Sequence, residues 1–170
     1  MTSPILVYGY GNLGRGDDGL GPRLVTALQD AGVDGAVCEA DYQLSVEDSA
    51  TLAGYEVVIF VDADMKGPAP FRFRRVEPAR EMSFSSHSAT PGQVLALAQQ
   101  MFGAKTRAFT LGIRGYVFGE MCEALSEAAQ ANLASALSFA THALDERRFD
   151  EYTREYDADR RCGGDPQPEV

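Results

Sequence analysis

Residues 57–61 (VVIFV) place the strongest constraint on how this chain can fold. A strand made from this run is apolar on both faces, because successive side chains point to opposite sides of a sheet. Strands that are buried on both faces are typical of parallel sheets covered by helices on each side. Residues 4–9 (PILVYG) form a second run of this kind and end in glycine. The two runs therefore predict buried strands of a parallel sheet in a layered α/β fold.

Strand and helix patterns alternate along most of the remaining chain. Apolar residues at helical spacing predict helices, and short runs rich in β-branched and aromatic residues predict strands. The predicted helices are 20–31, 45–53, 91–102 and 126–147, and the other predicted strands are 36–40, 71–76 and 108–113. We expect a single α/β domain, a three-layer α/β/α sandwich with a mostly parallel, twisted sheet.

Three details refine this expectation. The uncharged strand 57–61 is expected at the centre of the sheet. Residues 71–76 alternate apolar and basic side chains, which favours an edge strand with one wet face. Thr90, followed by Pro91 and by Gln93 three positions on, is typical of a capping box at the start of a helix.

Composition narrows the class of protein. The chain has 170 residues and a formal net charge of −10, from 15 Lys and Arg against 25 Asp and Glu. This charge argues against a nucleic-acid partner and against binding to anionic membranes. No apolar run approaches the roughly 20 residues of a membrane span, and the start of the chain does not resemble a signal peptide. We therefore expect a cytoplasmic protein.

The cysteines and one histidine are predicted to be structural. Cys38, Cys122 and Cys162 are widely spaced and form no C-x-x-C pair, which excludes a disulfide scaffold and a cysteine-rich zinc site and fits a reducing compartment. Cys38 and Cys122 are expected to be buried. His142 lies within the long predicted helix 126–147 and is expected to be an exposed helical residue.

The end of the chain is predicted to differ from the rest. Residues 145–161 include 12 charged residues in 17, and the residues that follow are rich in Gly and Pro. High charge and few apolar residues favour a mobile terminus. We therefore predict a folded domain over residues 1–149 and a charged, flexible tail over residues 150–170.

A glycine-rich segment follows the first strand. It contains G-x-G-x-x-G at Gly9, Gly11 and Gly14, the pattern of a dinucleotide-binding turn. In such a site the pyrophosphate lies at the N-terminus of the next helix. Here Asp17 and Asp18 occupy that place, and their negative charge opposes phosphate binding. A dinucleotide-binding domain therefore stays an alternative, and we expect no nucleotide cofactor.

Several metal-ligating residue types follow predicted strands. Asp17 and Asp18 come after the first strand, Asp62 ends the central strand, and His87 lies in a loop after the edge strand. Ligands bind at the carboxyl ends of strands in open α/β sheets, and carboxylate and imidazole groups suit zinc, nickel and similar cations. Each residue also has a structural alternative as a helix cap, a turn residue or a loop histidine. The serines in 83–88 lack the G-x-S-x-G pattern of a hydrolase nucleophile.

Four segments together resemble a known family. The first, within residues 5–21, reads G-x-G-N-x-x-x-x-D-D-x-x-G; the others are 58–63 (VIFVDA), 86–91 (SHSATP) and, less strictly, 111–126. This combination is similar to the hydrogenase maturation endopeptidases, which trim the large subunit of nickel-iron hydrogenases. The resemblance covers about residues 5–144.

The resemblance implies a function and a set of site residues. It implies a phosphorylase/hydrolase-like sandwich that recognises nickel already inserted in the hydrogenase large-subunit precursor and then removes the precursor's C-terminal extension. Asp18, Asp62 and His87 match the metal-contacting positions, and Asn12 and Asp17 are second-tier residues that shape the loop. No further catalytic residue is assigned. A nickel-centre sensor or carrier that does not cleave needs the same ligands and stays an alternative.

Overall fold

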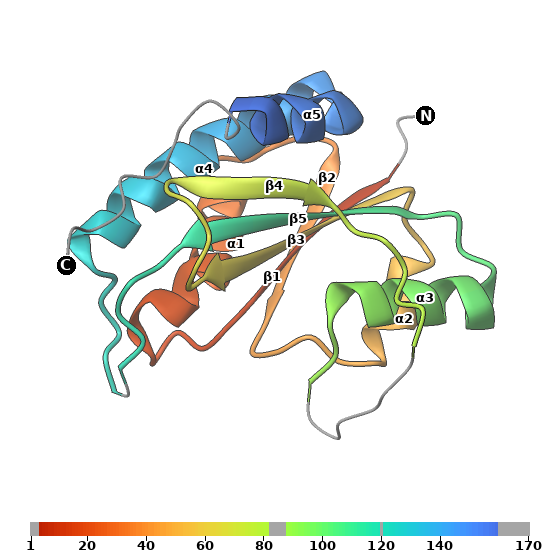
Figure 1. Cartoon of the computed structure of the whole chain (residues 1–170), viewed down its shortest axis with the longest axis horizontal. Helices are drawn as coiled ribbons and strands as arrows, with labels where there is room; N and C mark the ends of the chain where they lie inside the picture. The colour runs from red at the N-terminus through yellow and green to blue at the C-terminus, as the bar shows by residue number, and fades with distance from the viewer. Residues whose placement is uncertain (1–3, 82–87, 120, 160–170) are drawn as a thin grey trace.

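The middle layer of the molecule is a five-stranded sheet in the order β2-β1-β3-β5-β4. The computed structural model describes residues 4–81, 88–119 and 121–159. The strands are β1 (Ile5–Tyr10), β2 (Ala36–Asp41), β3 (Val57–Asp64), β4 (Phe71–Arg75) and β5 (Arg107–Arg114). Strands β2, β1, β3 and β5 are parallel, and β4 runs antiparallel to β5 (Figure 1).

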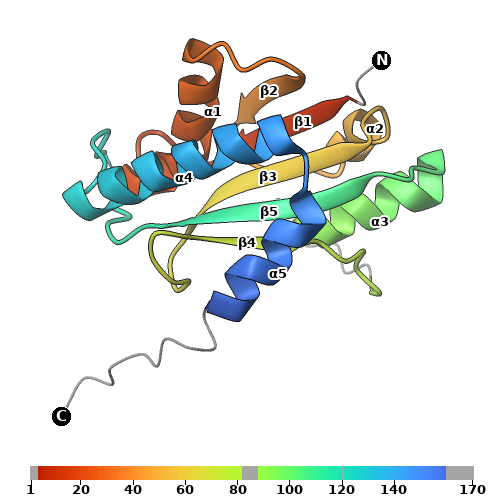
Figure 2. The same cartoon turned by 90° about the horizontal axis from the view of Figure 1, so that it is seen from above.

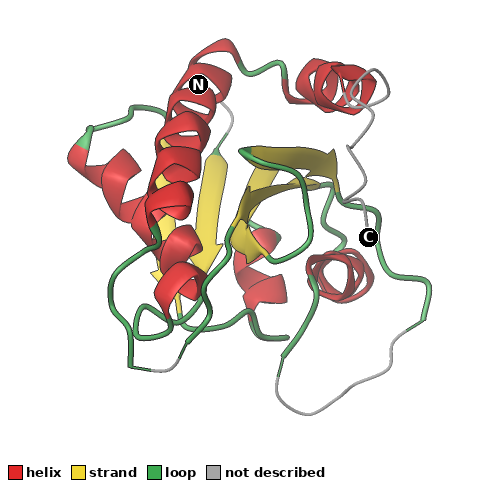
Figure 3. Ribbon diagram, turned by 60° about the vertical axis from the view of Figure 1, so that its left-hand side comes forward, coloured by secondary structure: helices red, strands yellow, loops and turns green. Residues whose placement is uncertain are grey.

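Helices cover both faces of this sheet (Figures 1 and 3). One face carries α1 (Leu20–Asp30), α4 (Glu127–Glu146) and α5 (Phe149–Asp159), and the other carries α2 (Asp48–Leu52) and α3 (Pro91–Phe102). Two hydrophobic clusters fill the spaces between the layers, one on each side of the sheet. The α/β/α sandwich predicted from the sequence is therefore confirmed. Within the described ranges, no helix combines the length and the apolar character that crossing a membrane requires.

The central strand behaves as its sequence predicts. The first five residues of β3 are buried, and β3 lies between β1 and β5. The alternating strand β4 lies at the edge of the sheet, with Phe71 and Phe73 buried and Arg74 exposed. The capping box of α3 is also confirmed, because the Thr90 hydroxyl accepts a hydrogen bond from Gln93 N–H and the Gln93 side chain accepts one from Thr90 N–H.

Close packing of α1 against β1 explains part of the glycine pattern. A methyl group at Gly9 would lie 2.5 Å from the Gly21 carbonyl oxygen of α1. A side chain at this position would therefore push the helix away from the sheet. A short 3-10 turn, η1 (Gly16–Gly19), separates β1 from α1, so the helix begins five residues later than in a dinucleotide-binding turn that opens directly after Gly14.

The segment that follows α4 differs from the prediction. Residues 149–159 form α5, which packs on the sheet beside β4 (Figure 2). Phe149 and Tyr152 are buried, and the Asp150 carboxylate accepts hydrogen bonds from Arg75 at 2.6 Å and Arg107 at 2.7 Å. The predicted flexible tail from Asp150 onward is therefore wrong over this helix. The prediction rested on the many charged residues of this segment and missed that Phe149, Tyr152 and Tyr156 form an apolar stripe at helical spacing.

Candidate functional site

The carboxyl ends of β1 and β3 bring the first candidate residues together. Their parallel register pairs Gly9 with Val61, so the next residues, Tyr10 and Asp62, are neighbours at the edge of the sheet. Both side chains follow the alternation of Tyr8 and Phe60, which belong to the hydrophobic cluster on the α2/α3 side. The site therefore forms where β1, β3 and the helical layer of α2 and α3 meet.

Asp62 is partly buried, and its surroundings raise the pKa of its carboxyl group. Its Oδ1 accepts a hydrogen bond from the Ala63 N–H at 2.8 Å. Burial raises the pKa of Asp62 to about 7, and the negative charges of Asp18 and Asp64 act in the same direction, whereas the hydrogen bonds from Ala63 N–H and the Tyr10 hydroxyl oppose the rise. The ionised carboxylate is therefore costly here, and a cation beside it would lower that cost.

Tyr10 is the residue that directly supports Asp62. Burial raises the pKa of Tyr10, and so does the charge of Asp62, with which the Tyr10 side chain forms a hydrogen bond. The phenol therefore stays protonated and acts as a donor to the carboxylate. The sequence contained no signal for this role, because Tyr10 is the unspecified residue between the two glycines of the G-x-G pattern.

Asp17 and Asp18 lie side by side in the 3-10 turn, but their side chains contact different parts of the chain. Asp18 Oδ2 accepts a hydrogen bond from the Asn12 N–H at 2.8 Å, which holds the start of the loop against the turn. Gly11 has φ +147°, and a side chain there would collide with the Asp18 backbone carbonyl. This close approach requires glycine. Neither aspartate caps α1, whose N-cap is Gly19 without a side-chain hydrogen bond.

Asp17 is fully buried and acts as a structural carboxylate. Its oxygens accept four hydrogen bonds of 2.7–2.9 Å, which come from Tyr116 N–H, Val117 N–H, Ser126 N–H and Ser126 Oγ. Burial alone would raise the pKa of Asp17, but these hydrogen bonds together hold it below its usual range. Asp17 thus joins the loop after β1 to the segment that leads into α4, and Ser126 is the N-cap of that helix.

Asn12 shapes the same loop through its side chain. Its Oδ1 accepts a hydrogen bond from Gly14 N–H at 2.8 Å, and its Nδ2 donates to the Tyr42 hydroxyl at 3.1 Å. The first bond lies within the loop after β1, and the second connects this loop to the segment after β2. Asn12 therefore lies beside the candidate site and organises its wall.

Asp18 and Asp62 line one cavity of about 380 Å³, which we call the acidic cavity. Its other lining residues come from the end of β1, the segment after β2, and the segment that leads into the first residue of α3: Tyr10, Gly11, Tyr42, Gln43, Leu44, Ser88, Ala89, Thr90 and Pro91. Two carboxylates that face one open space favour a cationic ligand, and carboxylate oxygens are suitable ligands for divalent metals.

The third predicted ligand, His87, lies outside the described residues. Ser88, which follows it in the sequence, lines the acidic cavity. Among the residues that the structure describes, no three His, Cys, Asp or Glu side chains form a group that could hold a metal ion. The structure thus brings two of the three predicted ligands together.

Comparison with known proteins identifies the architecture. No protein-family model matches the chain, and the search of curated proteins found no match. Solved structures do match. The [NiFe] hydrogenase maturation protease HycI from Thermococcus kodakarensis superposes with a TM-score of 0.66 at 19% identity, over 84% of this chain and 93% of that one. The chain has the fold of the hydrogenase maturation proteases.

Two further structures show the same fold. A hydrogenase 2 maturation peptidase from a Thaumarchaeota archaeon has a TM-score of 0.62 at 23% identity, over 84% of this chain and 98% of that one. The hydrogenase maturating endopeptidase HybD from E. coli has a TM-score of 0.62 at 21% identity, over 85% of this chain and 94% of that one. The maturation-protease fold therefore accounts for nearly the full length of these similar structures.

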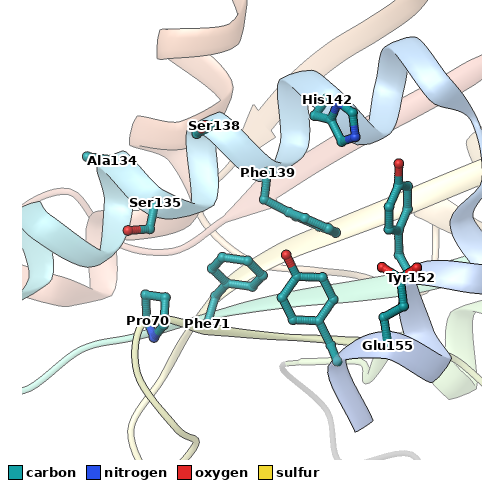
Figure 4. A pocket seen from close by; sticks show the side chains of 10 residues that line it. Pro70, Phe71, Ala134, Ser135, Ser138, Phe139, His142, Tyr152 and Glu155 are labelled. Atoms are coloured by element: carbon teal, nitrogen blue, oxygen red, sulfur yellow. The ribbon is translucent and has the colours of Figure 1, made fainter. Parts of the chain in front are cut away.

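A larger cavity lies on the opposite face of the sheet and is separate from the acidic cavity. It measures about 840 Å³ and lies between α4, α5 and the start of β4 (Figure 4). His142 lines it, is exposed as predicted, and has its ring centroid 5.9 Å from that of Tyr152. In this maturation-protease fold, His142 is therefore on the far side of the sheet from Asp62.

Cys38 and Cys122 are only partly buried, which corrects the expectation that they are buried.

Proposed function

We propose that the chain is an endopeptidase that recognises nickel in the precursor of a nickel-iron hydrogenase large subunit and removes the precursor's C-terminal extension. The observation that carries this proposal is the acidic cavity. Asp18 and Asp62, which match the metal-contacting positions of the maturation endopeptidases in sequence, face one space in a chain with the maturation-protease fold. The solved proteins of this fold include enzymes named as proteases and peptidases of hydrogenase maturation.

In this proposal the metal arrives with the substrate. Asp18, Asp62 and His87 contact the nickel of the precursor, and their oxygen and nitrogen donors suit a borderline divalent cation. Asp17 and Asn12 hold the loop that carries Asp18. The chain needs no nucleotide cofactor and acts in the cytoplasm.

The metal also offers a route to peptide-bond hydrolysis. A bound cation polarises a carbonyl oxygen or a water molecule and so lowers the barrier to attack. Nickel held between the precursor and the acidic cavity would act on the peptide bond that lies beside it. This role predicts that a precursor without nickel is not cleaved.

Intact-mass spectrometry of the precursor tests the proposal. A nickel-loaded large-subunit precursor from the source organism is incubated with the wild-type chain, with Asp62→Ala, or with Asp30→Ala, which alters an exposed carboxylate on α1. We expect the wild-type chain and Asp30→Ala to release one C-terminal peptide only when nickel is present, and Asp62→Ala to release none. Association without cleavage would favour the carrier alternative. The absence of both association and cleavage would contradict the proposal.

A further inference from the structure

A second cavity continues from the acidic cavity towards the edge of the sheet. It measures about 360 Å³ and shares Tyr10, Asp62 and Pro91 with the acidic cavity. Its far wall comes from β4 and β5. We call it the arginine cavity, and its remaining lining residues are Phe60, Ala63, Asp64, Met65, Arg72, Arg74, Thr110, Leu111 and Gly112. Asp62 therefore lies where two compartments meet.

The strand alternation of β4 places its arginines in this cavity. Phe71 and Phe73 face the core under α4 and α5, so Arg72 and Arg74 face the opposite side of the sheet. The antiparallel register sets Arg74 opposite Thr110. The basic side of this edge strand therefore faces the α2/α3 side of the sheet, the same side as Asp62.

The arginines of β4 differ in their partners. Arg72 Nε lies 3.8 Å from Asp64 Oδ2, and Arg75 pairs with Asp150 at 2.6 Å. Arg74 is exposed and has no carboxylate partner in the described parts of the chain. Arg154 also has no carboxylate partner among the described residues, but Arg74 differs from it because it lines a cavity together with Asp62. It offers planar, charged donors that match a carboxylate.

We propose that the arginine cavity is a subsite for a carboxylate of the bound polypeptide and that Arg74 binds this carboxylate. The inference rests on the proposed function, because the arginine cavity adjoins the site at which the polypeptide would be cleaved. The nearby carboxylates of Asp62 and Asp64 oppose a doubly charged phosphate more strongly than a singly charged carboxylate. The carboxylate comes from an acidic side chain or from the end of the substrate chain, and Arg74 is a specificity-determining residue.

Direct peptide binding tests the subsite without nickel and without cleavage. Chemical shifts of the ¹⁵N-labelled protein are followed while three short alanine-based probe peptides are added. One carries Glu with both ends blocked, one carries Gln with both ends blocked, and one carries Gln with a free C-terminal carboxylate. We expect the Glu peptide, the free-end peptide or both to shift resonances of β4 and β5, and the blocked Gln peptide to shift none.

Two variants assign the binding to Arg74. Arg74→Gln should weaken carboxylate-peptide binding about tenfold, the loss expected when one charge-assisted hydrogen bond is removed. Arg154→Gln, which removes an exposed arginine of α5, should leave binding unchanged. Thermal unfolding of both variants should match the wild-type chain, because Arg74 has no ion pair in the described parts of the chain to lose.

The possible outcomes separate the subsite from the proposed function. Equal binding of the blocked Gln peptide, unchanged affinity in Arg74→Gln, or no binding at millimolar peptide would overturn the subsite. The relative effects of the Glu and free-end peptides identify the source of the carboxylate. Carboxylate binding that depends on Arg74, in a chain that never cleaves a nickel-loaded precursor, would overturn the proposed function and leave the subsite standing.

Discussion

Asp17 and Asp18 are adjacent in the sequence but perform different tasks. Asp18 faces the acidic cavity, whereas Asp17 is buried and accepts four hydrogen bonds from the segment around Tyr116 and Ser126. An amide at position 17 would place an NH₂ group against some of these donors. We therefore expect Asp17→Asn to lower the free energy of unfolding by about 3 kcal/mol at pH 7.

Chemical denaturation measures this loss, with Asp30→Asn as a control that should change stability by less than about 0.5 kcal/mol. The pKa of Asp17 is lowered in the folded chain, so its contribution to stability is present above the unfolded pKa of about 3.9 and is lost as the pH falls below that value. The difference between the wild-type chain and Asp17→Asn should therefore shrink in acid. An Asp17→Asn variant as stable as the wild type at pH 7 would contradict the structural role.

The raised pKa of Asp62 predicts the opposite dependence of stability on pH. Its pKa is about 7 in the folded chain, mainly because of burial, against roughly 3.9 when unfolded. Between these values the folded state keeps a proton that the unfolded state has released, so the stability of the metal-free protein falls as the pH rises from about 4 to about 7.

Asp62→Asn removes this titration. With a chelator present, we expect the variant to be more stable than the wild type by about 2–4 kcal/mol at pH 8 and to differ little at pH 4, because each unit of pKa shift corresponds to about 1.4 kcal/mol. Denaturant titrations at the two pH values test this. The same stability difference at both values would show that Asp62 ionises normally in the folded chain.

At the scale of the elements, α5 is an integral part of the fold. Phe149 lies 5.6 Å from Phe109 of β5 between ring centroids, and Asp150 bridges Arg75 of β4 and Arg107 of β5. We expect Phe149→Ala to lower the free energy of unfolding by about 3 kcal/mol, the usual cost of removing a buried aromatic ring. Arg154→Ala, an exposed change on the same helix, should cost less than about 0.5 kcal/mol.

Truncation gives an independent measurement on the same element. A chain that ends after residue 148 should unfold at a clearly lower denaturant concentration than a chain that ends after residue 159, because only the first loses the Asp150 ion pairs and the rings of α5. Equal midpoints for the two truncations would mean that α5 contributes nothing to the stability of the sheet.

At the scale of the whole molecule, the two histidines of the chain provide a matched comparison. His142 lies on the α4/α5 side of the sheet, and the acidic cavity opens on the other. If His87 contacts the nickel of the precursor, His87→Ala should slow nickel-dependent cleavage about 100-fold or more, because a metal contact is lost. His142→Ala should cleave at the wild-type rate.

Cleavage is followed by intact mass, and circular dichroism and thermal unfolding of both variants should match the wild-type chain. Cleavage by His87→Ala at the wild-type rate would remove His87 from the proposed site and leave Asp18 and Asp62 as the only assigned contacts of the nickel. Equal loss in His142→Ala would instead point to a general effect on folding or on precursor docking.

Local patterns in the sequence determined the elements and their layers. The apolar run 57–61 required a strand buried on both faces, and the Thr90 capping box defined where α3 begins, because both depend on residues close together in the chain. The same patterns placed Asp18 and Asp62 at one edge of the sheet, where the carboxyl ends of parallel strands meet. The structure adds that their strands, β1 and β3, are neighbours.

Only the tertiary structure decided which distant segments meet. It separated Asp17 from Asp18 by burying Asp17 against a loop about 100 residues away, set Tyr10 against Asp62, and folded a charged segment onto β4 as α5. It also aligned Arg74 with the cavity of Asp62, which depends on the antiparallel pairing of β4 with β5. The apolar stripe of Phe149, Tyr152 and Tyr156 is a local sign of the helix, but it does not say that the helix packs on β4. The other contacts join residues far apart in the chain, so no local pattern encodes them.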